Sequence, residues 1–146
     1  MNIYTIGFTQ KNAETFFKLL VENKVECLVD VRLNNVSQLA GFTKANDLKY
    51  FLKQIGNITY IHNTNYAPTK DILDNYKKNK ISWAEYEKLY LNLISKRQVE
   101  KVFIKDVQQF NNVCLLCSEP TAQFCHRRLL AEYLKKNIDN VSIRNL

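Results

Sequence analysis

Residues 113–134 read VCLLCSEPTAQFCHRRLLAEYL, and this stretch decides the fold of the chain. The apolar run at 113–117 is typical of a buried strand, and the apolar spacing that follows predicts a helix over about 125–136. A strand that leads through a short turn into a helix is the repeating unit of α/β folds. Ligands bind at such turns, because strand ends and helix amino-termini face the same crevice.

The rest of the chain alternates between the same two patterns. Further strands are predicted at 3–7, 27–31, 58–61 and 141–143. Helices are predicted around Ala13, Phe16, Phe17 and Leu20; around Leu48, Phe51, Leu52 and Ile55, with Thr43 as cap; from a Ser82–Glu85 capping box onward; and over 99–110. We therefore expect one α/β domain over 1–146, a three-layer sandwich with a mainly parallel sheet of about five strands flanked by helices.

Residues 62–80 interrupt this alternation. They are polar, contain Pro68 and are longer than a structural connection requires. We predict that they form a loop or short helix beside the active site.

The composition indicates a cytoplasmic protein. The 146 residues suit a single domain with a real core, and no stretch is long and apolar enough to span a membrane. The chain starts in a strand-like segment without a secretory leader. Its four cysteines are therefore expected to be reduced thiols, and no membrane partner is expected.

The charge of this basic protein leaves two interpretations open. The formal net charge is +7, and lysines 70, 77, 78 and 80 crowd one segment, interleaved with tyrosines. A basic, aromatic surface suits a nucleic acid or nucleotide partner. The alternative is an ordinary solvated surface of a lysine-rich protein.

Several polar residues are predicted to meet in one crevice. If the strands are parallel, their carboxyl ends lie at one edge of the sheet. This would bring together Gly7, residues 30–32, His62 and residues 117–119. Thr9 and Ser37, in the loops after two of these strands, could add hydroxyl groups.

Asp30 and Arg32 leave the same face of one strand. Arg32 is a candidate anion-binding fork, with Asp30 as its orienter or as a base. The alternative is a structural salt bridge that ties down a loop. Gly7 permits a tight turn or a close approach to a ligand, whereas a lone His62 is as compatible with a structural role.

The cysteines differ in their predicted roles. Cys114 and Cys117 point to opposite faces of a strand, so Cys114 belongs to the core, whereas Cys117 and Glu119 share a face. Cys125 lies near a helix start and close to Arg127, which favours its thiolate. We expect Cys125 to be the most reactive thiol, as a nucleophile, a metal ligand or half of a redox disulfide.

Zinc is an alternative at the same residues. Cys117, Cys125 and His126 are soft or borderline ligands, and His62 or Glu119 could be a fourth. The spacing matches no standard zinc module, and adjacent residues on a helix point about 100° apart. The sequence therefore predicts no metal, and His126 need not act as the base of Cys125.

Three segments together resemble the domain of unknown function 488 family over essentially the whole chain. They are Thr5-Ile6-Gly7-Phe8-Thr9, Asp30-Val31-Arg32 with Ser37, and Cys117-Ser118-Glu119 with Cys125-His126-Arg127. Tyr66-Ala67-Pro68-Thr69-Lys70 resembles a branch-specific loop. The resemblance implies a small α/β fold and brings no established activity, substrate or cofactor. Family members often carry His, Ser and Pro where this chain has Phe8, Thr9 and Asn35.

Two functional hypotheses follow. The first is an enzyme acting on a phosphate-containing ligand, a nucleotide or nucleic acid. Its predicted catalytic residues are Asp30, Arg32, Cys117, Glu119, Cys125 and Arg127, and its predicted ligand-binding residues are Gly7, Thr9, Ser37, His62 and His126. The second is a non-catalytic ligand-binding, redox-sensing or regulatory module in which the polar cluster is structural.

Overall fold

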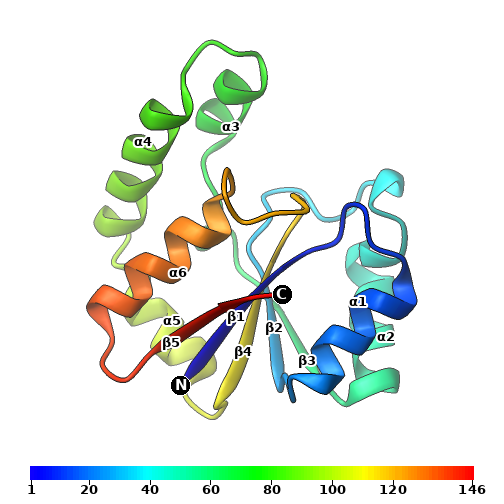
Figure 1. Cartoon of the computed structure of the whole chain (residues 1–146). Helices are drawn as coiled ribbons and strands as arrows, with labels where there is room; N and C mark the ends of the chain where they lie inside the picture. The colour runs from blue at the N-terminus through cyan, green and yellow to red at the C-terminus, as the bar shows by residue number, and fades with distance from the viewer.

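Five parallel strands form the centre of the molecule (Figure 1). The structure, a computed structural model, describes residues 1–146. In spatial order the strands are β3 (Thr59–His62), β2 (Cys27–Asp30), β4 (Asn112–Cys117), β1 (Asn2–Gly7) and β5 (Ser142–Asn145). Every neighbouring pair is parallel, which confirms the predicted α/β class and five-stranded sheet.

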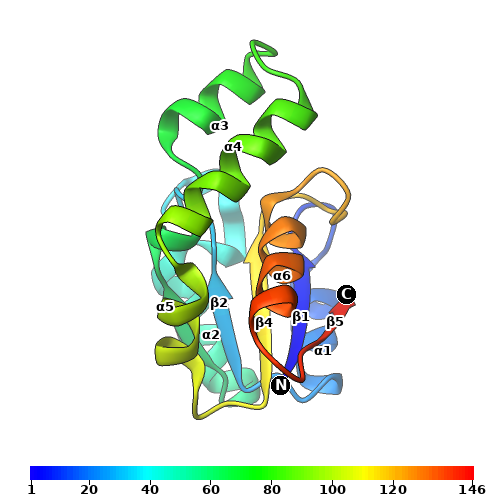
Figure 2. The same ribbon diagram turned by 90° about the vertical axis from the view of Figure 1, so that its left-hand side faces the viewer.

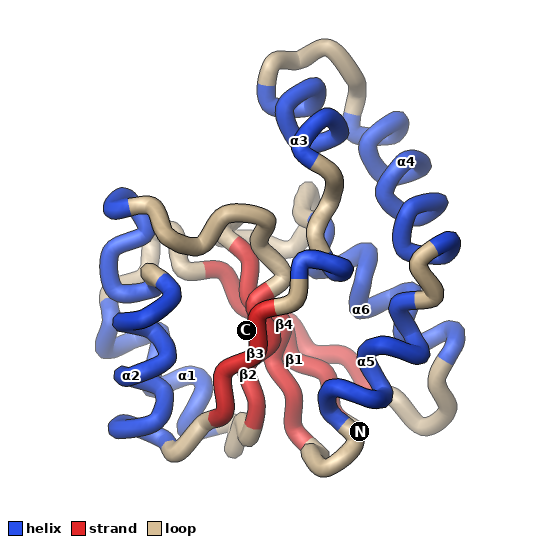
Figure 3. Tube along the Cα trace, turned by 180° about the vertical axis from the view of Figure 1, so that it is seen from behind, coloured by secondary structure: helices blue, strands red, loops and turns tan.

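Helices cover both faces of this sheet. One face carries α1 (Ala13–Glu22) and α2 (Ala45–Gly56), and the other carries α5 (Val99–Val107) and α6 (His126–Asn137), as Figure 3 shows from behind. Two 3₁₀ turns, η1 (Gln38–Thr43) and η2 (Thr64–Tyr66), lie in the connections. No helix combines the length and apolar character that crossing a membrane requires.

The alternation of side chains along the strands builds two cores. Ile6, Leu28 and Cys114 pack toward α1 and α2. Val29 and Cys117 pack on the opposite face, toward α5 and α6. Cys114 is fully buried, as predicted, and the period-2 geometry of a strand separates it from Cys117.

Two helices project beyond the carboxyl ends of the strands as an arm, which we call the helical arm (residues 70–96). It consists of α3 (Lys70–Lys77) and α4 (Trp83–Lys96) and stands above the sheet in Figures 1 and 2. The short helix predicted within 62–80 is thus present. Ser82 caps α4 as predicted, because its Oγ accepts a hydrogen bond from the Glu85 amide at 3.2 Å.

The predicted cap of α2 is wrong. Lys44 is the N-cap and makes no side-chain capping bond. Thr43 instead lies buried in η1, where its hydroxyl donates to the Ala40 carbonyl and accepts from Arg32. A tertiary contact with a buried arginine has taken the hydroxyl away from the local capping role.

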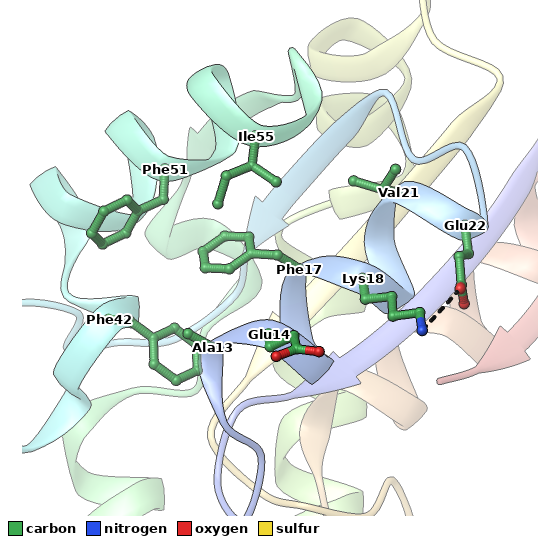
Figure 4. A pocket seen from close by; sticks show the side chains of 9 residues that line it. All are labelled: Ala13, Glu14, Phe17, Lys18, Val21, Glu22, Phe42, Phe51 and Ile55. Carbon is green, nitrogen blue, oxygen red and sulfur yellow. Dashed lines mark ion pairs between the residues drawn. The ribbon is translucent and has the colours of Figure 1, made fainter.

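The apolar faces predicted for α1 and α2 are only partly buried. Ala13 is exposed and Ile55 is 51% exposed, because these residues lie at the rim of the contact between the two helices. Figure 4 shows the apolar groove of about 510 Å³ that results, with Phe17, Phe42 and Phe51 along it. None of the predicted site residues lines this groove.

Candidate functional site

A pocket of about 130 Å³ lies between the carboxyl edge of the sheet and the helical arm. From the sheet and its loops it is lined by Arg32, Cys117, Ser118, Glu119, Cys125 and His126. From the arm it is lined by Leu73, Tyr76, Lys77, Trp83 and Tyr86. Five predicted site residues therefore meet in this pocket, since Ser118 was not among those predicted. The parallel strands bring them together from segments far apart in the sequence.

Asp30 and Arg32 form a closed ion pair beside the pocket. Arg32 donates from Nε to Oδ1 of Asp30 at 2.8 Å and from Nη2 to Oδ2 at 2.7 Å. The Tyr60 hydroxyl donates to Oδ2 at 2.6 Å, and Arg32 Nη2 also donates to the Thr43 carbonyl at 2.7 Å. Asp30 is completely buried and Arg32 is 4% exposed. This saturated geometry favours the structural salt bridge over a catalytic role.

The surroundings of this ion pair explain its electrostatics. Burial would lower the pKa of Arg32, but the hydrogen bond and charge of Asp30 raise it overall. Burial and the charge of Asp30 raise the pKa of Tyr60 well above its ordinary value. Arg32 also lies 5.4 Å from the ring centre of Phe8, within cation–π distance. His62 Nε2 lies 2.9 Å from the Arg32 carbonyl, so His62 contacts this network and does not line the pocket.

Cys117, Cys125 and His126 form a second buried cluster, on the floor of the pocket. One sulfur or nitrogen atom of each lies within 4.8 Å of the other two. Cys125 is the N-cap of α6 and has extended backbone angles, φ −139° and ψ 137°. The argument from adjacent helical residues was therefore wrong. Because Cys125 precedes the first helical turn, its side chain converges with that of His126.

A backbone contact orients the imidazole of His126. Its Nε2 lies 2.8 Å from the Val31 carbonyl, which can only accept, so Nε2 donates a hydrogen bond to it. The Cys117 sulfur lies 3.7 Å from Nδ1 and 3.9 Å from Nε2. His126 is thus placed against Cys117.

The two thiols of this cluster differ in acidity. A hydrogen bond from Cys125 outweighs burial and lowers the pKa of Cys117, with help from the amides of Ser118 and Glu119. The same hydrogen bond and burial raise the pKa of Cys125. Burial and the neighbouring thiol thus oppose the effect of the helix start and Arg127 on Cys125, and its high reactivity stays a prediction. Burial raises the pKa of Cys27 to about 12.

Arg127 is buried without a carboxylate. Its side chain is 1% exposed, and none of the ion pairs of the molecule includes it. Nη1 donates to the Glu119 carbonyl at 2.6 Å and to the Cys125 sulfur at 3.5 Å, and Nε donates to the Thr5 hydroxyl at 3.4 Å. Arg127 thus holds the loop after β4 against β1 and supplies positive charge beside a thiol.

Gly7 and Thr9 support the same loop. A Cβ at Gly7 would lie 1.6 Å from the Glu119 carbonyl oxygen, so no other residue fits there without a shift of the loop. Thr9 binds the Ser118 carbonyl through its amide at 3.2 Å and through its hydroxyl. Neither residue lines the pocket, and both position residues that do. Ser37 lies elsewhere, as the exposed cap of η1, where it accepts from the Leu39 amide at 3.2 Å.

Sequence reasoning missed the aromatic wall of the pocket. Trp83 and Tyr86 stack with ring centres 5.1 Å apart, and Phe124 meets Trp83 edge-on at 5.5 Å. The sequence predicted a helix from the Ser82–Glu85 capping box onward, which includes Trp83 and Tyr86. The pattern carried no signal that α4 would extend past the sheet and turn these rings toward the strand ends.

The family model for the domain of unknown function DUF488 matches residues 12–134. The chain belongs to this family. No curated protein and no solved structure matches it.

Proposed function

We propose that this member of the DUF488 family is an enzyme that acts on a small phosphate-containing ligand of the nucleotide kind. One observation carries the proposal: a single pocket combines a floor of two thiols and an imidazole with a wall of aromatic rings. Reactive groups under a partly apolar pocket are the usual arrangement of a small-molecule active site.

The wall suits a flat ring. Trp83, Tyr86 and Phe124 offer aromatic faces and edges, which stack on planar heterocycles. The pocket volume of about 130 Å³ is well below that of typical pockets for whole ligands, about 300–1,000 Å³. We therefore propose that one ring or one reacting group enters the pocket, and that the rest of the ligand stays at the mouth.

The mouth suits a phosphate. Lys77 lines the pocket from the end of α3, and Lys78 and Lys80 follow in the exposed turn of the helical arm. A flexible ammonium binds a phosphate as a point charge. The formal net charge of +7 would add attraction at longer range.

The reaction is assigned to the floor and to Glu119. The floor of Cys117, Cys125 and His126 lies beneath the reacting atom, and the exposed carboxylate of Glu119 acts as acid or base at the rim. Arg127, Gly7 and Thr9 are positioning residues for the loop. Four free thiols, all buried, are consistent with an enzyme that works in the reducing cytoplasm.

Fluorescence of Trp83 tests the proposal directly, because it is the single tryptophan and lines the pocket. Nucleoside monophosphates should quench or shift the emission, and nucleosides or inorganic phosphate alone should bind more weakly. Lys77→Ala should weaken binding about fivefold, the effect of roughly 1 kcal/mol. The matched control is Lys49→Ala, an exposed lysine of α2 on the other side of the sheet.

Two results would contradict the proposal. The first is unchanged emission with every nucleotide at millimolar concentration. The second is equal weakening by Lys77→Ala and Lys49→Ala. An oligonucleotide is the longer ligand to test, and its binding should fall steeply with salt if the lysines bind phosphates.

A redox-sensing module is the second candidate. It is favoured by the sulfur atoms of Cys117 and Cys125, which lie within 4.8 Å of each other. Mild oxidation by a disulfide reagent, followed by peptide mapping, would detect a bond between these two cysteines. A reversible bond in a protein that turns over no nucleotide would favour this candidate.

A further inference from the structure

We propose that Cys117, Cys125 and His126 bind one zinc ion at the floor of the pocket. The reaction that we assign to this ion rests on the proposed function, whereas the metal site itself does not. The three side chains come from two segments, the end of β4 and the start of α6. The spacing of the three residues matches no standard zinc motif, because the loop between β4 and α6 brings the two segments together.

The three ligand atoms lie close enough together to share one ion. Zinc takes thiolate sulfur at about 2.3 Å and imidazole nitrogen at about 2.0–2.1 Å, which places two such ligands about 3.6 Å apart. The Cys117 sulfur lies 3.7 Å from Nδ1 of His126, and all three ligand atoms lie within 4.8 Å of one another. The same sulfur is 3.9 Å from Nε2, so it lies beside the ring and not in line with Nδ1. The Cys117 and His126 side chains must therefore rotate to close the site around an ion.

The imidazole is oriented as a metal ligand. Its Nε2–H donates to the Val31 carbonyl at 2.8 Å, the outer contact that metal-binding histidines commonly make. The opposite nitrogen, Nδ1, belongs to a side chain that is 6% exposed, and its polar neighbour is the Cys117 sulfur. An ion bound between the imidazole and the two thiols would replace this contact.

The charges also fit. Two thiolates neutralise Zn²⁺, and a thiolate at Cys125 would accept the hydrogen bond from Nη1 of Arg127, 3.5 Å from its sulfur. This gives the buried guanidinium of Arg127, which has no carboxylate, a negatively charged neighbour.

A zinc site with three protein ligands leaves a fourth position for water, which is the arrangement of catalytic rather than structural zinc. Glu119 lines the same pocket and is exposed. We assign hydrolysis as the reaction class. A bound zinc ion would supply an activated water. Glu119 would hold one proton of that water and pass it to the leaving group, while the water oxygen bonds to the electrophilic atom and the bond to the leaving group breaks.

Metal content of the full chain tests the site. Purified protein should hold one zinc per chain by elemental mass spectrometry. The zinc-free protein should take up one cobalt(II) with thiolate-to-metal absorption in the near ultraviolet. Cys117→Ser, Cys125→Ser and His126→Ala should each weaken metal binding at least about tenfold. Cys114→Ala is the matched control, since this thiol lies in the other core and should leave the metal in place.

Three results would overturn the zinc site. They are a chain that binds no cobalt at micromolar metal, an equal loss in Cys114→Ala, and a different metal held in place of zinc. Circular dichroism identifies any variant that fails to fold, and His126→Gln then replaces it. A Trp83 titration of the metal-free protein separates the zinc site from the proposed nucleotide binding. A chain that binds nucleotides but takes up no metal would contradict the zinc site and leave the nucleotide proposal in place.

Discussion

Arg32 and Arg127 are both buried at the carboxyl edge of the sheet, but only one of them has a carboxylate. Arg32 shares two hydrogen bonds with Asp30, which Tyr60 also supports. Arg127 contacts a hydroxyl, a backbone carbonyl and a thiol. A buried charge must be compensated, so the first cluster is complete within the chain. The second cluster has no carboxylate and lies next to two thiols, which is why we propose the functional role for it and the structural role for the first.

Replacing each arginine tests this difference, and Arg32→Met should show the largest loss of stability of all the variants. Arg32→Met should cost about 3–5 kcal/mol of unfolding free energy, because it leaves the Asp30 carboxylate buried and unpaired. Arg127→Met breaks no ion pair and should cost about 1–2 kcal/mol through lost hydrogen bonds. Urea unfolding measures both.

The double variant Asp30→Leu with Arg32→Met keeps this test usable if Arg32→Met does not fold. It should be more stable than Arg32→Met alone, because no buried charge remains. Equal losses in Arg32→Met and Arg127→Met would contradict the distinction between the two clusters.

Gly7→Ala tests the support of the functional cluster. The new Cβ would lie 1.6 Å from the Glu119 carbonyl, so the loop must move. We expect a loss of about 1–3 kcal/mol in stability, together with weaker cobalt and nucleotide binding. Gly56→Ala in α2 is the control. There the closest atoms belong to the Ile58 side chain, at 2.9 Å, and not to the backbone, so the loss of stability should be smaller than in Gly7→Ala, at about 1 kcal/mol. Unchanged ligand binding in Gly7→Ala would show that the loop position is not critical.

Tyr60→Phe tests how far the structural cluster depends on its third member. The hydroxyl donates to Asp30 at 2.6 Å, and its loss should cost about 1–2 kcal/mol. Tyr133→Phe removes a similar bond, to Glu100 at 2.7 Å, from a partly exposed site. That control should cost less than about 0.5 kcal/mol, because solvent replaces the bond. Thermal unfolding of the two variants should therefore differ, and equal shifts would rule out a special role for burial.

The smallest expected effect is the difference between the wild type and Tyr60→Phe in how stability depends on pH. The pKa of Tyr60 is raised in the folded protein, first by burial and then by Asp30. Its stabilising contribution is therefore complete below the unfolded pKa of about 10, and it is lost as the pH rises from there toward the raised folded value. Between pH 9 and 10.5 the wild type should lose more stability than Tyr60→Phe, by less than about 1 kcal/mol, since the ring is partly solvated. A parallel decline would contradict the raised pKa.

The sequence predicted the fold closely because the signals were periodic. Strands at 3–7 and 113–117 appear as Asn2–Gly7 and Asn112–Cys117, and the helix predicted over 125–136 appears as His126–Asn137. Local chemistry was less reliable where tertiary contacts competed for the same group. The Thr43 hydroxyl binds Arg32 in place of capping α2.

Part of the candidate site followed from the same logic. Parallel strands must end at one edge, so Arg32 and Cys117 were expected to meet, and both line the pocket. The meeting of Cys125 with His126 could not be predicted, since it depends on the extended backbone of one residue at the start of α6. The aromatic wall could not be predicted either, because it depends on the direction in which the helical arm leaves the sheet.

The sequence by itself determined the α/β class, the single parallel sheet and the edge at which polar residues gather, because each follows from hydrophobic periodicity and strand direction. Only the tertiary structure decided which polar residues are paired and which are free. Asp30 lies two residues before Arg32 in the sequence and pairs with it, whereas Arg127 is separated from every carboxylate by the packing of α6 on β1. The local pair was one of the two possibilities that the sequence left open. Its burial and the isolation of Arg127 depend on distances between segments that the fold brings together, and no local pattern encodes those distances.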